Sequence, residues 1–235
     1  MELRKKSVKN KGVIKHLHIW DLPKKYFPKK TKAFEYKDEL LRMMSNLQFT
    51  NKFVQHKART TSYNIDSINH VRGFKPQMEE VFGSIEEFIY HYENYCHRAY
   101  SFREKLLQFI NAVLPVGYDE REVNMRQMTI NPVVKQAKLL HVLERFKDDG
   151  DLGKITKDRQ LLTHRLYFSG QIDHYLRPVG VVSFKNKQEF KTWCDNWKKE
   201  IMQRAKLTDK FTDAIFDINH EITPRIVNYK ELLKR

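Results

Sequence analysis

The chain has 235 residues, enough to bury one large core or one core with an appendage. Hydrophobic residues make up 40% of it and aromatic residues 12%, which excludes a disordered chain. The formal net charge is +15, and residues 1–60 carry +11 of it, so a polyanion such as RNA is the expected partner. The alternative is that these lysines only keep the protein soluble.

Few glycines and prolines interrupt the chain, and apolar residues recur three and four positions apart. This pattern predicts an all-α fold built from long antiparallel helices. We expect residues 1–35 to form an irregular basic arm. Its aromatic residues Trp20, Tyr26 and Phe27 either stack on RNA bases or pin the arm to the main body.

The first two helices are predicted from periodicity and capping residues. A helix over 38–56 is followed by a loop over 60–76. Ser84, with Glu87 three positions later, is expected to cap a second helix that runs to Leu114. The buried face of this second helix is expected to comprise Phe88, Tyr92, Tyr95, Cys96, Ala99, Phe102, Leu106, Phe109, Ile110 and Val113.

The remaining elements follow from the same signals. A third helix is expected from Pro132 to Lys147, capped by Asn131, and a fourth over 157–168, capped by Thr156. A short strand or extended connection follows over 179–184. Asn186 is expected to cap a fifth helix, and a sixth begins at Thr208 and is interrupted by Pro224.

The chemistry is expected in the fourth helix, where four residues separate Arg159 from His164 and Arg165 follows directly. Arginine binds phosphate through a planar fork and histidine carries a proton near neutral pH, so the pair can cleave RNA without a metal. Chance alone predicts the spacing roughly 0.6 times in a chain with this many arginines and histidines, so its context must support it.

The position of the motif in that helix has two consequences. In the first turns, Arg159 would add its charge to the positive end of the helix and to its free N–H groups. Five positions on a helix place Arg159 and His164 about 140° apart around its axis. A cleft with another helix, or with the same helix of a second copy, would bring two such pairs together.

The Arg-x4-His pattern, together with the tyrosine-rich run over 90–98 of the long second helix, resembles the HEPN superfamily. The resemblance covers roughly residues 84–205. Many members are metal-independent endoribonucleases of toxin–antitoxin, abortive-infection and CRISPR effector systems. The resemblance implies a helical bundle that dimerises, with the two motifs in one cleft. We expect residues 1–80 to hold the basic arm and first helix, and residues 81–235 the HEPN-like domain.

The resemblance also implies roles for the motif residues. Arg159 would bind the scissile phosphate, and His164 would act as general acid or base in attack by the 2′-hydroxyl, leaving a 2′,3′-cyclic phosphate and a 5′-hydroxyl. Gln160 stands where the family commonly has Asn, Asp or His. The residues expected to contact RNA are Gln160, Arg165, Arg98, Arg103 and His97.

The cysteines and the hydropathy pattern indicate the cell compartment in which the protein is expected. Cys96 and Cys194 each lie in an apolar stripe, which excludes a cysteine-based zinc site and predicts buried thiols in a reducing compartment. We find no signal peptide and no run of 18 apolar residues, so we expect a cytoplasmic protein without a membrane span. No metal and no cofactor are expected, and the expected partners are RNA, a second copy, and an antitoxin or other defence protein.

The sequence leaves three interpretations open. In the first the chain is an endoribonuclease, and in the second it is a non-catalytic HEPN-like module that binds RNA or a partner protein. In a third interpretation Arg159 and His164 are structural, and Arg159 pairs with Asp158 or Asp151.

Overall fold

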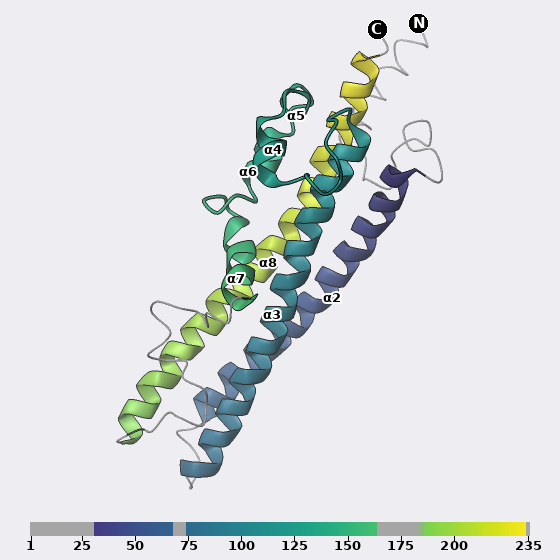
Figure 1. The fold of residues 1–235 in the computed structure, drawn as a ribbon. Helices are drawn as coiled ribbons and strands as arrows, with labels where there is room; N and C mark the ends of the chain where they lie inside the picture. Colours follow the sequence, from purple (N-terminus) through teal and green to yellow (C-terminus); the bar gives the residue numbers. More distant parts are fainter. Residues whose placement is uncertain (1–30, 68–73, 164–183, 185, 234–235) are drawn as a thin grey trace, which may run out of the picture. The chain divides into compact units, whose positions relative to one another are not determined.

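The computed structural model describes residues 31–67, 74–163, 184 and 186–233, and the expected all-α fold is confirmed over these residues (Figure 1). No strand occurs within these ranges. The helices there are α2 (Lys32–Ser67), α3 (Phe74–Val113), α4 (Met125–Ile130), α5 (Pro132–Gln136), α6 (Leu140–Glu144), α7 (Gly153–Thr163) and α8 (Lys187–Leu232).

The chain divides into two compact units, and α2, α3 and α8 each contribute to both. Unit 1 comprises residues 1–45, 101–154 and 213–235, and unit 2 comprises residues 46–100 and 155–212. Helices α4, α5 and α6 belong to unit 1, whereas nearly all of α7 belongs to unit 2.

Unit 1 packs the first part of α2 and the last parts of α3 and α8 around an apolar core. Polar contacts at its edge join α2 to α3 and to the segment after α3: Lys105 pairs with Glu39 at 3.0 Å, and Lys32 pairs with Glu120 at 2.6 Å. The core includes Leu40, Met44, Phe102, Leu106, Phe109, Ile110, Val134, Leu143, Phe146, Ile215, Ile218, Ile222 and Ile226.

Unit 2 packs the second part of α2 and the first parts of α3 and α8 together with α7. Polar contacts also cross its interior. For example, the Tyr95 hydroxyl donates to the Thr208 carbonyl at 2.9 Å, and Gln55 Nε2 donates to the Ala205 carbonyl at 2.7 Å. Its core includes Leu47, Val54, Ile85, Phe88, Tyr92, Tyr95, Cys96, Ala99, Ile155, Phe190, Trp193, Trp197, Ile201 and Phe211. The predicted buried face of the long second helix is therefore confirmed.

The predicted boundary between the first two helices is wrong. α2 continues to Ser67, so residues 60–67 are helical, and α3 begins ten residues before Ser84. Ser84 does not cap a helix; inside α3, its hydroxyl donates to the Glu80 carbonyl at 2.9 Å. Pro76 lies in the first turn of α3, where its missing N–H leaves no bond unmade.

The third predicted helix is interrupted. Asn131 caps α5 as expected, its side chain accepting from the Val133 N–H at 2.9 Å. Lys138 then adopts a positive φ of 57°, which ends α5, and α6 starts at Leu140.

α8 replaces the fifth and sixth predicted helices. Asn186 caps it as expected, accepting from the Glu189 N–H at 2.9 Å. The predicted start at Thr208 is wrong, because the Thr208 hydroxyl donates to the Ala205 carbonyl inside a continuous helix. The predicted interruption at Pro224 is also wrong, because the helix continues to Leu232.

Three expectations fall outside this comparison. The basic arm lies outside the described residues except for its last five, where α2 already begins at Lys32. The connection predicted over 179–184 also lies outside them except for Phe184. The domain division at residue 80 stays a prediction. Both cysteines are buried, as expected.

Candidate functional site

Helix α7 carries the motif arginine, but not where the sequence placed it. The helix starts at Gly153, so Arg159 is its seventh residue and lies beyond the turn that has free N–H groups. The expected help from a helix N-terminus, and Thr156 as its cap, are therefore wrong. α7 is described to Thr163, so His164 and Arg165 lie outside the described residues, and so does the side chain of Gln160.

Arg159 lies against an aromatic ring of the neighbouring helix. The carbon at the centre of its guanidinium is 4.2 Å from the centroid of the Tyr100 ring on α3. Both side chains are half-buried. The ring attracts the cation and excludes solvent where the two groups touch, which restricts the conformations of the guanidinium. Arg159 is thus a positioned cation.

The residue before Arg159 anchors α7 to unit 2 through a buried ion pair. Asp158 Oδ2 accepts from Arg204 Nη1 on α8 at 2.6 Å and from the Tyr92 hydroxyl on α3 at 2.6 Å. Asp158 and Arg204 are each 6% exposed, and Tyr92 is fully buried. A pair this deeply buried is costly to break, because the remaining charge would lose its partner without regaining water.

Two further features complete this anchor. Arg204 Nε also binds Glu200 Oε1 at 2.6 Å, one helical turn earlier on α8. Burial raises the pKa of Tyr92 well above its ordinary value, so its hydroxyl keeps its proton and donates it to Asp158. Because Asp158 is adjacent to Arg159, the anchor fixes the rotation of α7 and with it the direction in which Arg159 leaves the helix.

The sequence left open that Arg159 is structural and pairs with Asp158 or Asp151, but the structure gives each of these carboxylates another partner. Asp158 pairs with Arg204, and Asp151 pairs with Arg145 at 2.9 Å. Each of the two carboxylates suggested for Arg159 is thus bound by another arginine.

The face of α3 that carries Tyr100 holds other ionisable groups at helical spacing. His97 and Glu93 precede Tyr100 by three and seven residues, so the three share one side of the helix. Burial raises the pKa of Glu93 above its ordinary value. His97 and Arg98 are exposed and belong to unit 2 with Arg159. Their contact with RNA stays a prediction.

Arg103 lies in unit 1, and its guanidinium donates hydrogen bonds to the next residue, Glu104. Its Nη2 is 2.8 Å from Oε1 of Glu104 and its Nε 3.0 Å from the same oxygen. The predicted contact of Arg103 with RNA stays untested.

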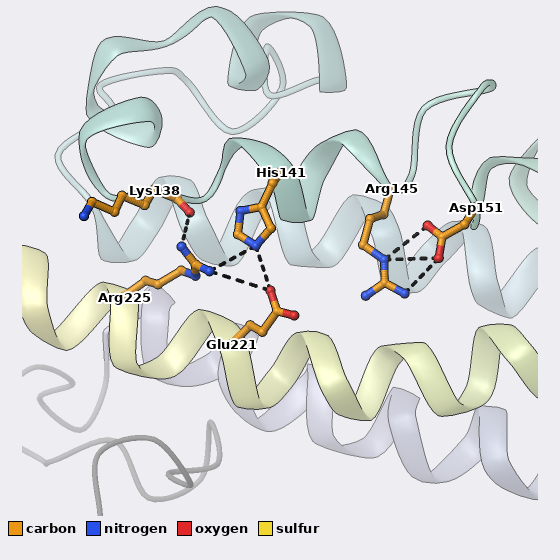
Figure 2. A network of polar contacts seen from close by, with 6 residues as sticks. All are labelled: Lys138, His141, Arg145, Asp151, Glu221 and Arg225. Carbon is orange, nitrogen blue, oxygen red and sulfur yellow. Dashed lines mark hydrogen bonds and ion pairs between the residues drawn. The ribbon is translucent and has the colours of Figure 1, made fainter. Parts of the chain in front are cut away.

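In unit 1, an arginine and a histidine meet between α6 and α8 (Figure 2). His141 Nε2 is 2.8 Å from Glu221 Oε2 and 3.1 Å from Arg225 Nη2. Arg225 also donates to the backbone carbonyl of Lys138 at 2.7 Å. Arg225 therefore binds the turn at Lys138, where the chain has its positive φ. We interpret this cluster as a clamp that holds α5 and α6 on α8.

Sequence reasoning missed Tyr100 and Arg204, which shape the site, and it suggested Arg159 as the partner of Asp158, which instead pairs with Arg204. A signal existed for one of them. Arg204 continues the apolar stripe of Trp197 and Ile201 at helical spacing, and a cation on a buried stripe requires a buried acid. The partner could not be identified, because Asp158 lies 46 residues away in sequence.

Over the described ranges, no group of three His, Cys, Asp or Glu side chains is placed to hold a metal ion. Within the same ranges, no helix is both long and apolar enough to span a membrane.

Comparison with models of protein families matches most of the chain. The family model HEPN_Cthe2314, described as HEPN-like, matches residues 38–223. A search of curated proteins and a search of solved structures each gave no match. The matched range contains every described helix from α3 to α7, with most of α2 and α8.

Proposed function

Because the chain belongs to the HEPN superfamily, through the HEPN_Cthe2314 family, we propose that it is a metal-independent endoribonuclease. Members of the superfamily are often ribonucleases, and a HEPN domain suggests a function related to RNA or to defence. The net charge of +15 fits an RNA substrate.

In the proposed reaction, Arg159 binds the scissile phosphate and His164 transfers a proton. The ribose 2′-oxygen attacks phosphorus and loses its proton to a base, while the bond to the 5′-oxygen breaks and that oxygen gains a proton. The products are a 2′,3′-cyclic phosphate and a 5′-hydroxyl. His164 serves one of the two proton transfers.

The observation that carries the proposal is the placement of Arg159. Its guanidinium lies 4.2 Å from the Tyr100 ring, on a helix fixed by the buried pair between Asp158 and Arg204. An arginine held in this way is prepared to bind a phosphate with little further loss of side-chain freedom. A surface arginine without such support would lose more.

We include in the proposal that two copies form the site and that the protein is a toxin or an antiviral-defence effector. Two copies supply two arginines and two histidines to one cleft, which solves the separation of Arg159 and His164 around the helix axis. An antitoxin or another defence protein is then the expected regulator.

The product ends test the proposal directly. Purified chain incubated with single-stranded RNA in EDTA should yield fragments with a 2′,3′-cyclic phosphate and a 5′-hydroxyl, because no metal is needed to activate the attacking oxygen. Mass spectrometry of the fragments identifies both ends. RNA that binds with salt-sensitive affinity but stays intact would instead support the non-catalytic module, and loss of cleavage in EDTA would contradict the mechanism.

A second prediction concerns Tyr100. Replacing it with Phe keeps an aromatic face beneath Arg159, whereas Tyr100→Leu removes that face. We expect Tyr100→Leu to lower kcat/KM for RNA cleavage about 2- to 5-fold, as loss of a partly exposed cation–π contact predicts, and Tyr100→Phe to keep most of it. Thermal unfolding of both variants serves as the control. Equal activity of the Leu and Phe variants would show that the ring does not position Arg159.

A further inference from the structure

One side of α2 in unit 2 exposes aromatic and cationic side chains together. Phe49 is 62% exposed, Phe53 40% and Tyr63 73%. Between them Lys52, His56 and Arg59 are also exposed. At 100° per residue, all six fall within a stripe about 120° wide, and from Phe49 to Tyr63 the stripe is about 21 Å long.

Helix α3 extends this stripe with two more rings. His91 lies parallel to Phe53, with ring centroids 5.6 Å apart and an interplanar angle of 9°. Phe49 meets Phe53 edge to face at 4.8 Å, and Tyr90 meets His91 edge to face at 5.4 Å. Tyr90 is 62% exposed. The eight residues Phe49, Lys52, Phe53, His56, Arg59, Tyr63, Tyr90 and His91 are called the α2 stripe below.

The concentration of exposed aromatic rings here is specific to this part of the molecule. In the described residues, every aromatic ring among the exposed large hydrophobic side chains belongs to the α2 stripe. The others, Ile130, Met202, Leu232 and Leu233, are aliphatic. Exposed rings on one face indicate a partner, because solvent contact of so much apolar surface is unfavourable.

The charges on the stripe limit the kind of partner. Residues 40–65 contain no Asp or Glu. Among the described residues, no carboxylate forms an ion pair with Lys52 or Arg59, whereas Lys57 beside them pairs with Glu87 at 2.5 Å. Two copies meeting through this face would bring their lysines and arginines together, which is unfavourable. A chain of phosphates would satisfy the same cations.

We propose that the α2 stripe binds single-stranded RNA, with bases stacking on Phe49, Phe53 and Tyr90 and phosphates contacting Lys52 and Arg59. Rings interleaved with cations are the arrangement that binds unpaired strands without reading their sequence, because every base has a face that can stack. Burial lowers the pKa of His91, so its ring is neutral at pH 7 and packs flat against Phe53.

This inference takes RNA as the ligand from the proposed function and rests on that function. It adds that the α2 stripe selects unpaired strands. Bases in a duplex are already stacked on one another and cannot reach the rings. The stripe therefore favours unpaired segments over duplex RNA, whatever residues carry out the cleavage.

The test measures binding of the full chain carrying His164→Ala, so that cleavage does not enter. The probe is a fluorescein-labelled 20-nucleotide oligouridine, followed by fluorescence anisotropy over a series of salt concentrations. Adding Phe49→Ala and Phe53→Ala should weaken binding at least about fivefold and leave the salt dependence unchanged, because stacking involves no charge. Adding Lys52→Ala and Arg59→Ala should reduce the slope of log K against log salt by about 1.4.

Matched controls come from α8 in the same unit. Met202→Ala removes another exposed apolar side chain, and Lys199→Ala with Lys206→Ala removes two exposed cations from a helix that also carries acids. We expect these variants to bind like the parent. A duplex RNA of the same length should bind more weakly than oligouridine, and the Phe49/Phe53 variant should reduce that difference.

Three results would overturn the inference. The first is unchanged oligouridine affinity in the stripe variants, and the second is an equal loss in the α8 controls. The third is a change from dimer to monomer in sedimentation, with RNA affinity unchanged, which would make the stripe a protein interface. The outcome is separable from the proposed function: a chain that cleaves RNA but binds it independently of the stripe refutes only this inference. A chain whose stripe binds RNA that is never cut refutes only the cleavage.

Discussion

Replacing His164 with Ala is expected to lower the rate of RNA cleavage by about 10²- to 10⁴-fold, the contribution of a positioned proton-transfer group. In sequence, His164 comes directly after Thr163, the last described residue of α7, the helix that carries Arg159. The rate constant should be measured on single-stranded RNA with enzyme in excess, so that product release does not limit it. Affinity for the RNA should change little, because Arg159 and the other cations remain.

The matched control for this variant is His141→Ala. His141 lies in unit 1, where it contacts Glu221 and Arg225. Its loss removes a histidine of the clamp and should leave the cleavage rate within about twofold of the parent. Circular dichroism and sedimentation establish that both variants keep their fold and oligomeric state. Cleavage by His164→Ala at the parent rate would eliminate the proposed mechanism.

The largest effect on stability is expected at Asp158. Replacing it with Ala leaves Arg204 buried with only part of its charge satisfied by Glu200, and it deprives the Tyr92 hydroxyl of its acceptor. We expect the free energy of unfolding to fall by about 3 to 5 kcal/mol, the usual cost of removing one partner of a buried pair. Urea unfolding followed by circular dichroism measures this loss.

Two controls separate a buried pair from charge loss in general. Asp151→Ala breaks the exposed pair with Arg145, and we expect it to cost less than about 1 kcal/mol. The double variant Asp158→Ala with Arg204→Met removes both charges and should recover part of the loss, since no buried charge is then left without a partner. If Asp158→Ala were no worse than Asp151→Ala, the pair would not anchor α7.

The anchor also links stability to the proposed chemistry. Asp158 fixes the helix on which the next residue, Arg159, rests against Tyr100. Under conditions where Asp158→Ala is still folded, its cleavage should fall further than its folded fraction explains, because the guanidinium loses its fixed direction. Measuring the folded fraction and the cleavage rate in the same buffer separates these two effects.

The helix boundaries show which capping residues can be recognised from the local sequence and which cannot. Asn131 and Asn186 were correctly identified as caps, because each precedes a helix and has an amide oxygen that accepts from a free N–H. Ser84 and Thr208 carry the same kind of signal but lie inside helices, where their hydroxyls bond to carbonyls one turn back. A hydroxyl group can do either, and packing of the apolar stripes on both sides decided that the helices continue.

The sequence by itself predicted the helical class, the buried stripes and the superfamily, all of which are confirmed, because each depends on residues close together in the chain. The pair Arg159 and His164 stays a prediction of the sequence. Only the tertiary structure showed that Arg159 lies beyond the first turn of α7, that it rests on Tyr100, and that Asp158 meets Arg204. These contacts join residues 46 and more positions apart, and no local spacing specifies them. The packing of α3, α7 and α8 within unit 2 therefore determines which side chains orient Arg159.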